Sequence, residues 1–234
     1  MEALPLNLPP VTPSPDANEF WRFFNEVAAP QLAHREDTFR KIFQYLDTCP
    51  APITIVETGC VRLAGNWSGD GQSTILFDKY VTARGSNSKV HSVDINAAHV
   101  DACRELVGPN VIVTVADSVA YLNVLTRQLK DHAVKINLLY LDSFDLDEVY
   151  WFASASHHLK ELLSAWRSVD KETLVVVDDC PLNVKLVRPN ANQYTVYGEP
   201  SVGGKGRLIA EFAHQVGVAP LFTGYQAGWV GLQF

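Results

Sequence analysis

The sequence predicts an α/β protein built on a doubly wound, mostly parallel sheet. Two observations predict this fold class. From residue 53 onward, short β-branched runs alternate with stretches whose apolar residues recur at helical spacing, which is the pattern of βαβ units. The composition, with 47% apolar and 19% charged residues over 234 positions, is that of a globular chain with a sizeable core. We therefore expect helices on both faces of the sheet.

Charge and segment composition exclude several classes of partner. Lys and Arg number 19 against 26 Asp and Glu, and the net charge of -7 leaves no broad basic surface for nucleic acid. No apolar run approaches the roughly 20 residues that cross a bilayer, and the first residues lack the pattern of a signal peptide. We expect a cytoplasmic protein that binds neither nucleic acid nor membrane, and whose 4 cysteines are free thiols.

The N-terminal region is expected to comprise an arm and a helical cap. Five of the 13 prolines fall in residues 1–15, which favours an extended arm. Residues 16–50 predict two helices, the first with an aromatic stripe that includes Phe20 and Phe24, the second from Gln31 to Asp47. The stripe either packs against the main domain or covers the substrate as a lid. A homodimer joined through the arm and helices is a further expectation.

Residues 51–234 predict the main domain. Its apolar, β-branched runs are expected to be strands at residues 53–58, 89–95, 110–117, 135–142 and 173–179. The amphipathic stretches are expected to be helices at residues 74–82, 97–106, 119–129, 156–166 and 208–215. Two further short runs, joined at Gly224 to Gly228, predict an antiparallel pair that closes the sheet.

Every predicted parallel strand carries an acidic residue at or next to its carboxyl end. In a doubly wound sheet, ligands bind outside the carboxyl ends of the strands, where loops and helix N-termini meet. A turn or a helix cap explains one such acid, but acids at every strand end favour a binding site. These acids are Glu57, Asp94, Asp117, Asp142 and the adjacent pair Asp178 and Asp179.

The loop after the first strand and the end of the second predict a nucleotide-like ligand. The loop carries Gly59 and Gly71, and the next helix opens near Ser73, so the backbone can approach a ligand and offer it N–H donors. Asp94, followed by Ile95, has the position of the acid that binds ribose hydroxyls. Its alternative role is to cap the following helix.

The end of the third strand distinguishes between two nucleotide-like cofactors. A nicotinamide dinucleotide would use the first two strands and would not need the later acids. S-adenosylmethionine (SAM) fits better, because Asp117 and Ser118 can hold its adenine while acids of the first loop, with Glu57 nearby, hold its ammonium group. We therefore expect SAM as the cofactor.

Asp142, Asp178 and Asp179 are expected to meet on the substrate side of this cofactor. Three clustered carboxylates repel one another unless a proton or a cation intervenes. An all-oxygen ligand set selects a hard ion, Mg2+ first, with Mn2+ or Ca2+ as substitutes. Helix capping and loop hydrogen bonds are the alternative roles of the three residues.

Candidates for a catalytic base follow the fourth strand. Asp142 itself, Asp145 and His158 are the residues we select, and His157 is an adjacent alternative. A paired histidine at a helix start is also typical of a solvent-facing or structural pair. The glycines of residues 203–206 do not have the spacing of a phosphate-binding loop, and predict either a mobile loop or a substrate-side segment.

Four motifs resemble the class I SAM-dependent O-methyltransferases: VETG at 56–59, GQST at 71–74, LDS at 141–143 and VVVDD at 175–179. The three aspartates are similar to those of the metal-dependent macrocin and novobiocin type, whereas catechol O-methyltransferases carry Asp-Asn at the last pair. The resemblance covers residues 53–234. It implies a Rossmann-like sheet of seven strands, the last antiparallel.

The resemblance also implies roles for individual residues. Mg2+ would be held by Asp142, Asp178 and Asp179, with a substrate hydroxyl completing its coordination. Glu57, Gly59 and Ser73 would contact the methionine part, Asp94 the ribose, and Asp117 with Ser118 the adenine. The chain departs from the family in its longer first loop, CVRLAGNWSGDG, and in having no evident counterpart of the lysine base of the catechol branch.

The expected function is methyl transfer from SAM to a hydroxyl of a small molecule, a sugar or a phenol or catechol, assisted by a divalent metal. Two alternatives remain open on the sequence. One is a relative with the same cofactor fold that methylates nitrogen. The other is a non-catalytic module that binds the cofactor and contacts a partner through the N-terminal region.

Overall fold

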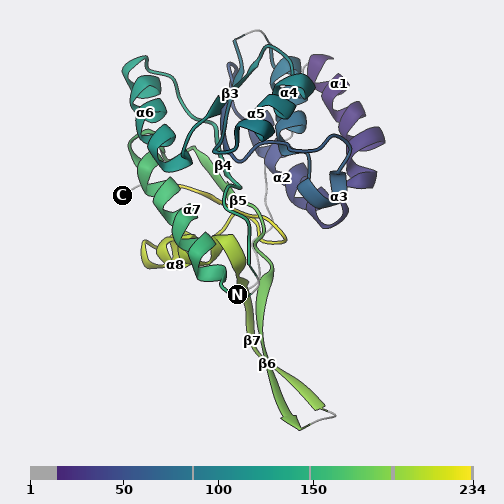
Figure 1. Ribbon diagram of the computed structural model, residues 1–234, viewed down its shortest axis with the longest axis vertical. Coiled ribbons are helices and arrows are strands. Elements are labelled where there is room, and N and C mark those ends of the chain that lie inside the picture. The colour runs from purple at the N-terminus through teal and green to yellow at the C-terminus, as the bar shows by residue number, and fades with distance from the viewer. Residues whose placement is uncertain (1–14, 86, 148, 191–192, 233–234) are drawn as a thin grey trace.

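A computed structural model describes residues 15–85, 87–147, 149–190 and 193–232, with residues 15–18 and 182–200 described by their backbone alone. The predicted Pro-rich arm therefore lies outside the described residues except for Pro15. A six-stranded sheet forms the centre (Figure 1). Its strands are β1 (Thr54–Thr58), β2 (Lys89–Asp94), β3 (Val111–Val115), β4 (Leu138–Leu141), β5 (Leu174–Val177) and β8 (Ala227–Val230).

The strand order is β3-β2-β1-β4-β5-β8, and only β8 runs antiparallel to its neighbour. The order reverses between β1 and β4, which makes this the switch point of a Rossmann-like sheet. The predicted α/β fold with a final antiparallel strand is confirmed. Seven strands were expected, but the described residues place six in the sheet.

The segment after β5 explains the difference in strand number. It forms a separate hairpin of β6 (Leu182–Asn190) and β7 (Gln193–Val202), which extends away from the rest of the chain (Figure 1). The expected closing pair is also reduced, because Phe222 makes only an isolated bridge to Gly228 beside β8. Since the hairpin strands pair with each other, they add nothing to the edge of the main sheet.

Helices cover both faces of the sheet. They are α1 (Pro15–Phe23), α2 (Glu36–Asp47), α3 (Trp67–Asp70), α4 (Ser73–Ala83), α5 (Ala97–Leu106), α6 (Ser118–Asp131), α7 (Trp151–Ala165) and α8 (Arg207–Gln215). Four of the predicted helices agree with α4, α5, α6 and α8 to within two residues at each end, and α7 begins five residues before its predicted start. None of the described helices combines the length and apolarity that a bilayer span requires.

Alternation along the central strands divides the core between the two faces. In β1, Ile55 packs into the cluster formed with α2 and α4, whereas Val56 packs into the cluster formed with α6, α7 and α8. Tyr140 and Leu139 in β4 divide in the same way. Successive strand residues point to opposite faces, so a strand covered on both faces is apolar throughout.

The N-terminal helices belong to the first of these clusters. The aromatic stripe of α1 is buried there, with Phe20 stacked edge-on against Phe43 and Tyr80 at ring-centroid distances of 4.6 and 5.0 Å. The predicted helix over 31–47 begins only at Glu36, because Ala33 has a φ of +50° and short 3-10 turns precede it. These turns end at Arg35, which faces the carboxyl edge of the sheet.

Candidate functional site

A cavity of about 680 Å3 opens at the carboxyl ends of β1, β2, β3 and β4. Its walls come mainly from the loops that follow these strands. Further lining residues come from the 3-10 turn before α2, the end of β5, the helices α5 and α7, the turn before α8 and the segment before β8. This is where a doubly wound sheet binds ligands, since the loops diverge at the switch point between β1 and β4. The lining includes six of the predicted cofactor residues: Gly59, Ser73, Asp94, Ile95, Asp117 and Ser118.

Gly59 brings the first loop against the fourth strand. Its φ is +78°, and a Cβ at this position would lie 2.7 Å from the carbonyl oxygen of Asp142. Its N–H continues the sheet by donating to the carbonyl oxygen of Val93 at 2.8 Å. The positive φ and the absence of space for a Cβ both require glycine, which lets the first loop lie directly against the end of β4.

The acids after β2 and β3 lie on one wall. The Asp94 carboxylate accepts the backbone N–H of Asn96 at 2.7 Å, and Asn96, rather than Asp94, caps α5. Asp117 does cap α6, accepting the N–H of Ala120 at 2.9 Å, while also lining the cavity. The Asp94 carboxylate also lies 3.5 Å from Nδ1 of His99 and 3.9 Å from Sγ of Cys60. Asp94 therefore lines the cavity without capping a helix, whereas Asp117 both caps α6 and lines the cavity.

Glu57 does not line the cavity. Its buried carboxylate accepts hydroxyl hydrogen bonds from Ser73 at 2.6 Å, Thr74 at 2.8 Å and Ser92 at 2.6 Å. Burial raises its pKa to about 7, although these three hydroxyls lower it. Glu57 thus links the start of α4 to β1 and β2. It lies below the cavity lining, where it positions the helix start and does not itself reach the predicted cofactor space.

Gly71 also lies outside the cavity lining. It ends α3 in the left-handed conformation, and a Cβ there would lie 2.9 Å from Cδ of Arg35. Gly71, predicted to contact the cofactor, instead packs against the side chain of Arg35. A short turn without a side chain lets Arg35 pass into the site.

The backbone around the cavity is strained at three non-glycine residues. Gln72, Phe144 and Asp179 have φ values of +53°, +43° and +46°. Such conformations cost about 1–3 kcal/mol each and persist where surrounding contacts impose them. The side chain of Gln72 shows such contacts, because it bonds the backbone of Gly65 at 3.1 Å and of Leu63 at 2.9 Å.

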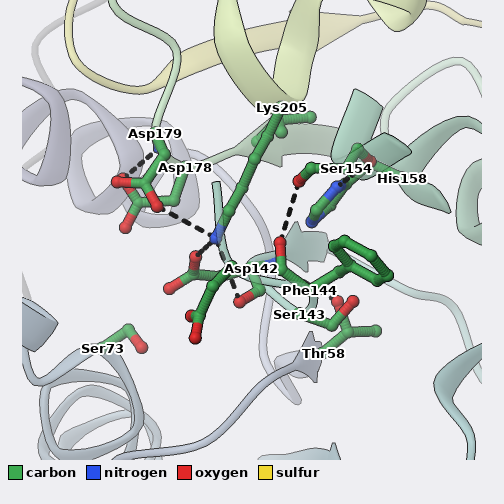
Figure 2. Close-up of polar contacts among 12 residues, drawn as sticks. Thr58, Ser73, Asp142, Ser143, Phe144, Ser154, His158, Asp178, Asp179 and Lys205 are labelled. Atoms are coloured by element: carbon green, nitrogen blue, oxygen red, sulfur yellow. Dashed lines mark hydrogen bonds and ion pairs between the residues drawn. The ribbon is translucent and has the colours of Figure 1, made fainter. Parts of the chain in front are cut away.

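The three aspartates of the predicted metal site do meet, but with two basic side chains among them. Lys205 Nζ lies 2.6 Å from Asp142 Oδ1 and 3.0 Å from Asp179 Oδ2, and Figure 2 shows it pointing between the two carboxylates. Arg35 Nε lies 3.0 Å from Asp178 Oδ2, and Arg35 Nη2 lies 3.1 Å from Asp179 Oδ1. Each of the three carboxylates is thereby paired with a cation.

Asp178 is enclosed behind the cavity. Its side chain is 1% exposed, and its Oδ2 also accepts the hydroxyl of Tyr140 at 2.9 Å. That hydroxyl accepts a hydrogen bond from Gln226, whose amide oxygen accepts one from Thr38. Burial and the Asp178 charge hold the pKa of Tyr140 well above its usual value. The network fixes Asp178 as a partner of Arg35 and keeps it away from ligands.

These residues do not fit a divalent cation as they stand. The ammonium of Lys205 is 2% exposed and occupies the space between Asp142 and Asp179 that a shared ion would need. Within the described ranges, no group of three or more His, Cys, Asp or Glu side chains could hold a metal ion. The predicted Mg2+ site, with Mn2+ or Ca2+ as substitutes, is therefore not supported by the geometry.

Electrostatics keep the ammonium of Lys205 charged. Burial by itself would lower the pKa of Lys205, but the charges of Asp142 and Asp179 outweigh it and raise that pKa well above its usual value. The same pairing, with Tyr225 and Arg35 nearby, lowers the pKa of Asp179 in spite of its burial. The group acts as a compact salt bridge at the cavity wall.

Of the adjacent histidines on α7, His157 lines the cavity and His158 does not. His158 is 0% exposed and donates from Nδ1 to the carbonyl oxygen of Ser154 at 2.7 Å, as seen in Figure 2. His157 Nε2 lies 3.0 Å from Ser118 Oγ and 3.4 Å from Glu161 Oε1. Adjacent helical residues point about 100° apart, so only one of the pair can face the cavity. The selection of His158 as a base is corrected accordingly.

Lowering the pH from 7.5 to 5 is expected to cost about 2 kcal/mol of stability through His158. Burial lowers its pKa from 6.5 to about 4, with Lys205 and His157 also lowering it and Glu161 opposing them. Between pH 6.5 and about 4, His158 is protonated in the unfolded chain but not in the folded chain, so the free energy of unfolding decreases as the pH is lowered. Urea denaturation at both pH values, on the wild type and His158→Gln, measures the difference. Equal pH dependence in the two proteins would contradict it.

Asp145 lies at the rim of the cavity. Its side chain is 83% exposed and pairs with Arg62 at 3.3 Å, and Arg62 in turn pairs with Asp70 at 3.0 Å. An exposed pair of this kind contributes little, typically 0–1 kcal/mol. Asp145 is therefore a rim residue, and the inner wall beside the salt bridge belongs to Asp142.

Arg35, Lys205 and Tyr225, which surround the acid cluster, were not selected from the sequence. The turn of residues 203–206 is buried, so the mobile-loop alternative is wrong, and it brings Lys205 to the cavity wall, in keeping with the alternative of a segment beside the site. The guanidinium carbon of Arg35 lies 4.4 Å from the ring centroid of Tyr225. One signal was present in the sequence, since three clustered carboxylates require compensating charge. A lysine between glycines, shortly after the last acid pair, is a candidate for that charge.

No protein-family model and no curated protein matches the chain. Among solved structures it resembles a SAM-dependent methyltransferase from Aquifex aeolicus, with 14% identity, a TM-score of 0.45 and coverage of 92% of this chain and 96% of that one. A SAM-dependent methyltransferase from Anabaena variabilis shows 11% identity and a TM-score of 0.46, with coverage of 93% of this chain and 95% of that one. A pericyclic reaction enzyme shows 14% identity and a TM-score of 0.45, with coverage of 82% of this chain and 47% of that one. At such identities and TM-scores the similarity assigns no activity to this chain.

Proposed function

We propose that this protein transfers a methyl group from SAM to a hydroxyl oxygen of a small molecule. The observation that carries the proposal is the cavity at the switch point of the sheet, with an acidic residue on its wall at the ends of β2, β3 and β4. Gly59 permits close approach of a ligand to the end of β1. Together these features match the parts of SAM in the order in which the strands lie.

The charge of the cavity favours SAM over a dinucleotide. Six carboxylates and three Lys or Arg side chains line it, and one of those carboxylates, Asp179, is shared between Arg35 and Lys205. A net negative cavity attracts the sulfonium and ammonium groups of SAM. A pyrophosphate would be repelled by the same wall. Asp94 is suited to the ribose hydroxyls, because a carboxylate accepts hydrogen bonds from both.

Methyl transfer is an in-line displacement at the sulfonium methyl group. The acceptor oxygen forms a bond to the methyl carbon while the bond from that carbon to sulfur breaks, and the neutral thioether S-adenosylhomocysteine leaves. The hydroxyl proton must pass to a base, and we assign this role to the Asp142 carboxylate on the cavity wall. The protein otherwise supplies position, since the two reactants must meet in line.

Replacing Asp94 with asparagine is expected to weaken SAM binding by roughly 10–100-fold, because one charged acceptor for the ribose is lost. The substitution preserves shape and one acceptor oxygen, so the bond from the N–H of Asn96 can persist. Isothermal titration calorimetry with SAM measures the change. Asp101→Asn is the matched control, since Asp101 lies exposed on α5 and its one ion pair among the described residues is with Arg104.

The calorimetry also tests the proposed function. Wild-type protein that binds no SAM at millimolar concentration would refute it, and equal affinities for the wild type and Asp94→Asn would refute the ribose contact. Transfer of a labelled methyl group to candidate acceptors, with identification of the methylated atom, then separates oxygen from nitrogen methylation. Binding without transfer to any acceptor would favour a non-catalytic module.

A further inference from the structure

The ammonium of Lys205 contacts both carboxylates of the cavity wall and one backbone carbonyl oxygen. It contacts Asp142 Oδ1 at 2.6 Å, Asp179 Oδ2 at 3.0 Å and the carbonyl oxygen of Asp142 at 3.4 Å. Figure 2 shows the side chain fully extended toward these atoms. A metal ion is often held in this way, by carboxylates from the ends of two different strands. Here the ammonium of Lys205 occupies the position that such an ion would have.

The turn that carries Lys205 is locked to the end of β5. The N–H of Lys205 donates to the carbonyl oxygen of Asp179 at 3.1 Å. Gly204 has a φ of +50°, and a Cβ there would lie 2.1 Å from the same carbonyl oxygen, while one at Gly206 would lie 2.4 Å from Sγ of Cys180. Because these contacts leave no room for side chains, the glycines on both sides of Lys205 seat its backbone directly against the acid pair.

The charge of the cluster is close to balance with Lys205 in place. Asp142, Asp178 and Asp179 supply three negative charges, and the positive charges of Arg35 and Lys205 neutralise two of them. A divalent ion beside Asp142 and Asp179 would be repelled by the buried ammonium and would lose the carboxylate oxygens that the ammonium already holds. The ion and the lysine therefore compete for one position.

We propose that Lys205 takes the place of a divalent cation in this site, so that the wall is organised without metal. Lys205 is a positioning residue: it holds Asp142 and Asp179 at the cavity and offsets their charge, and it acts on the acceptor through Asp142. The exclusion of metal follows from the cluster alone. The consequence for turnover, that methyl transfer needs no added metal, rests on the proposed function.

The first test is a calorimetric titration of the full chain with Mn2+ alone. We expect no binding to the wild type at millimolar Mn2+, and binding at least about tenfold tighter to Lys205→Ala, because the carboxylates then lack a cation. Lys205→Arg, which keeps the charge, should again exclude Mn2+. Lys135→Ala is the matched control, since Lys135 also bridges two carboxylates, Asp170 and Glu172, but on the surface.

The outcomes decide the proposal in either direction. Wild-type binding of Mn2+ that matches Lys205→Ala would overturn it, as would a folded Lys205→Ala that gains no affinity over the wild type. If Lys205→Ala fails to fold by circular dichroism, the longer apolar Lys205→Met takes its place, and the wild-type titration still decides whether metal is excluded.

The second test measures turnover in EDTA. Wild-type turnover should change less than twofold, and Lys205→Met should lose at least about 100-fold while Lys205→Arg recovers part of it. Loss of wild-type turnover in EDTA with recovery in Mn2+ would overturn the proposal. SAM binding is measured on the same samples. Failure to bind SAM refutes the proposed function, whereas the Mn2+ titration answers the question about Lys205 independently.

Discussion

Replacing Arg35 with leucine is expected to lower the free energy of unfolding by about 3–5 kcal/mol. The guanidinium is buried and pairs with Asp178 and Asp179 at 3.0 and 3.1 Å, and Nη1 donates to the carbonyl oxygen of Ser68 at 3.3 Å. Leucine would leave the enclosed Asp178 carboxylate without its cation, and a buried unpaired charge costs far more than a lost surface contact. Thermal denaturation should show a melting temperature lower by roughly 10 °C.

Arg40→Leu is the matched control for this loss. Arg40 lies on α2, a few residues beyond Arg35, and makes an i to i+4 pair with Glu36 at 2.6 Å with about a third of each side chain exposed. Exposed pairs of this type contribute about 0.3–0.5 kcal/mol. If the two variants had the same stability, the pairing of Arg35 with Asp178 would not be a main support of the fold.

Replacing Asp142 with asparagine is expected to reduce methyl transfer by about 100- to 10,000-fold with little change in SAM affinity. Asparagine keeps the shape and an oxygen that Lys205 Nζ, 2.6 Å from Oδ1 in the wild type, can still contact. It removes the carboxylate that we assign to accept the hydroxyl proton. Single-turnover kinetics with a labelled methyl group, together with calorimetry for SAM, measure the two quantities separately.

Asp147→Asn is the control for Asp142→Asn. Asp147 lies in the same loop, is exposed, and accepts the N–H groups of Val149 and Tyr150 at 2.8 and 2.7 Å, which asparagine can also do. Its turnover should stay within about twofold, since such surface substitutions rarely matter. Full activity in Asp142→Asn would place the base elsewhere, and His157, which lines the cavity, would be the next residue to replace.

Most of the sheet, and the acids along one of its edges, could be predicted from the sequence. The strands and their order of appearance follow from runs such as Ile53 to Glu57 and Leu174 to Val177, because a buried strand and an amphipathic helix have different periods that any short window reveals. The acids at the ends of β2, β3 and β4 could be assigned to the cavity edge for the same reason, since parallel strands all end on one side.

The direction in which a side chain points from its strand or helix was harder to predict from the sequence. Glu57 ends its strand as the other acids do, but it points into the hydroxyls beneath α4 and not into the cavity. His157 and His158 are equivalent in a sequence pattern, and the rotation of α7 on the sheet decides that His157 faces the cavity. The departure of β6 and β7 from the sheet likewise depends on which partner each strand finds.

The cations that neutralise the acid cluster are brought to it by the packing of distant segments. Arg35 pairs with Asp178 across 143 residues of sequence, and Lys205 reaches Asp142 across 63. Local periodicity contains no information on contacts at such separations, because they arise when whole elements pack together. The sequence could show that three carboxylates would meet and that a cation had to join them. The packing of the 203–206 turn against β5 is what makes a buried lysine that cation.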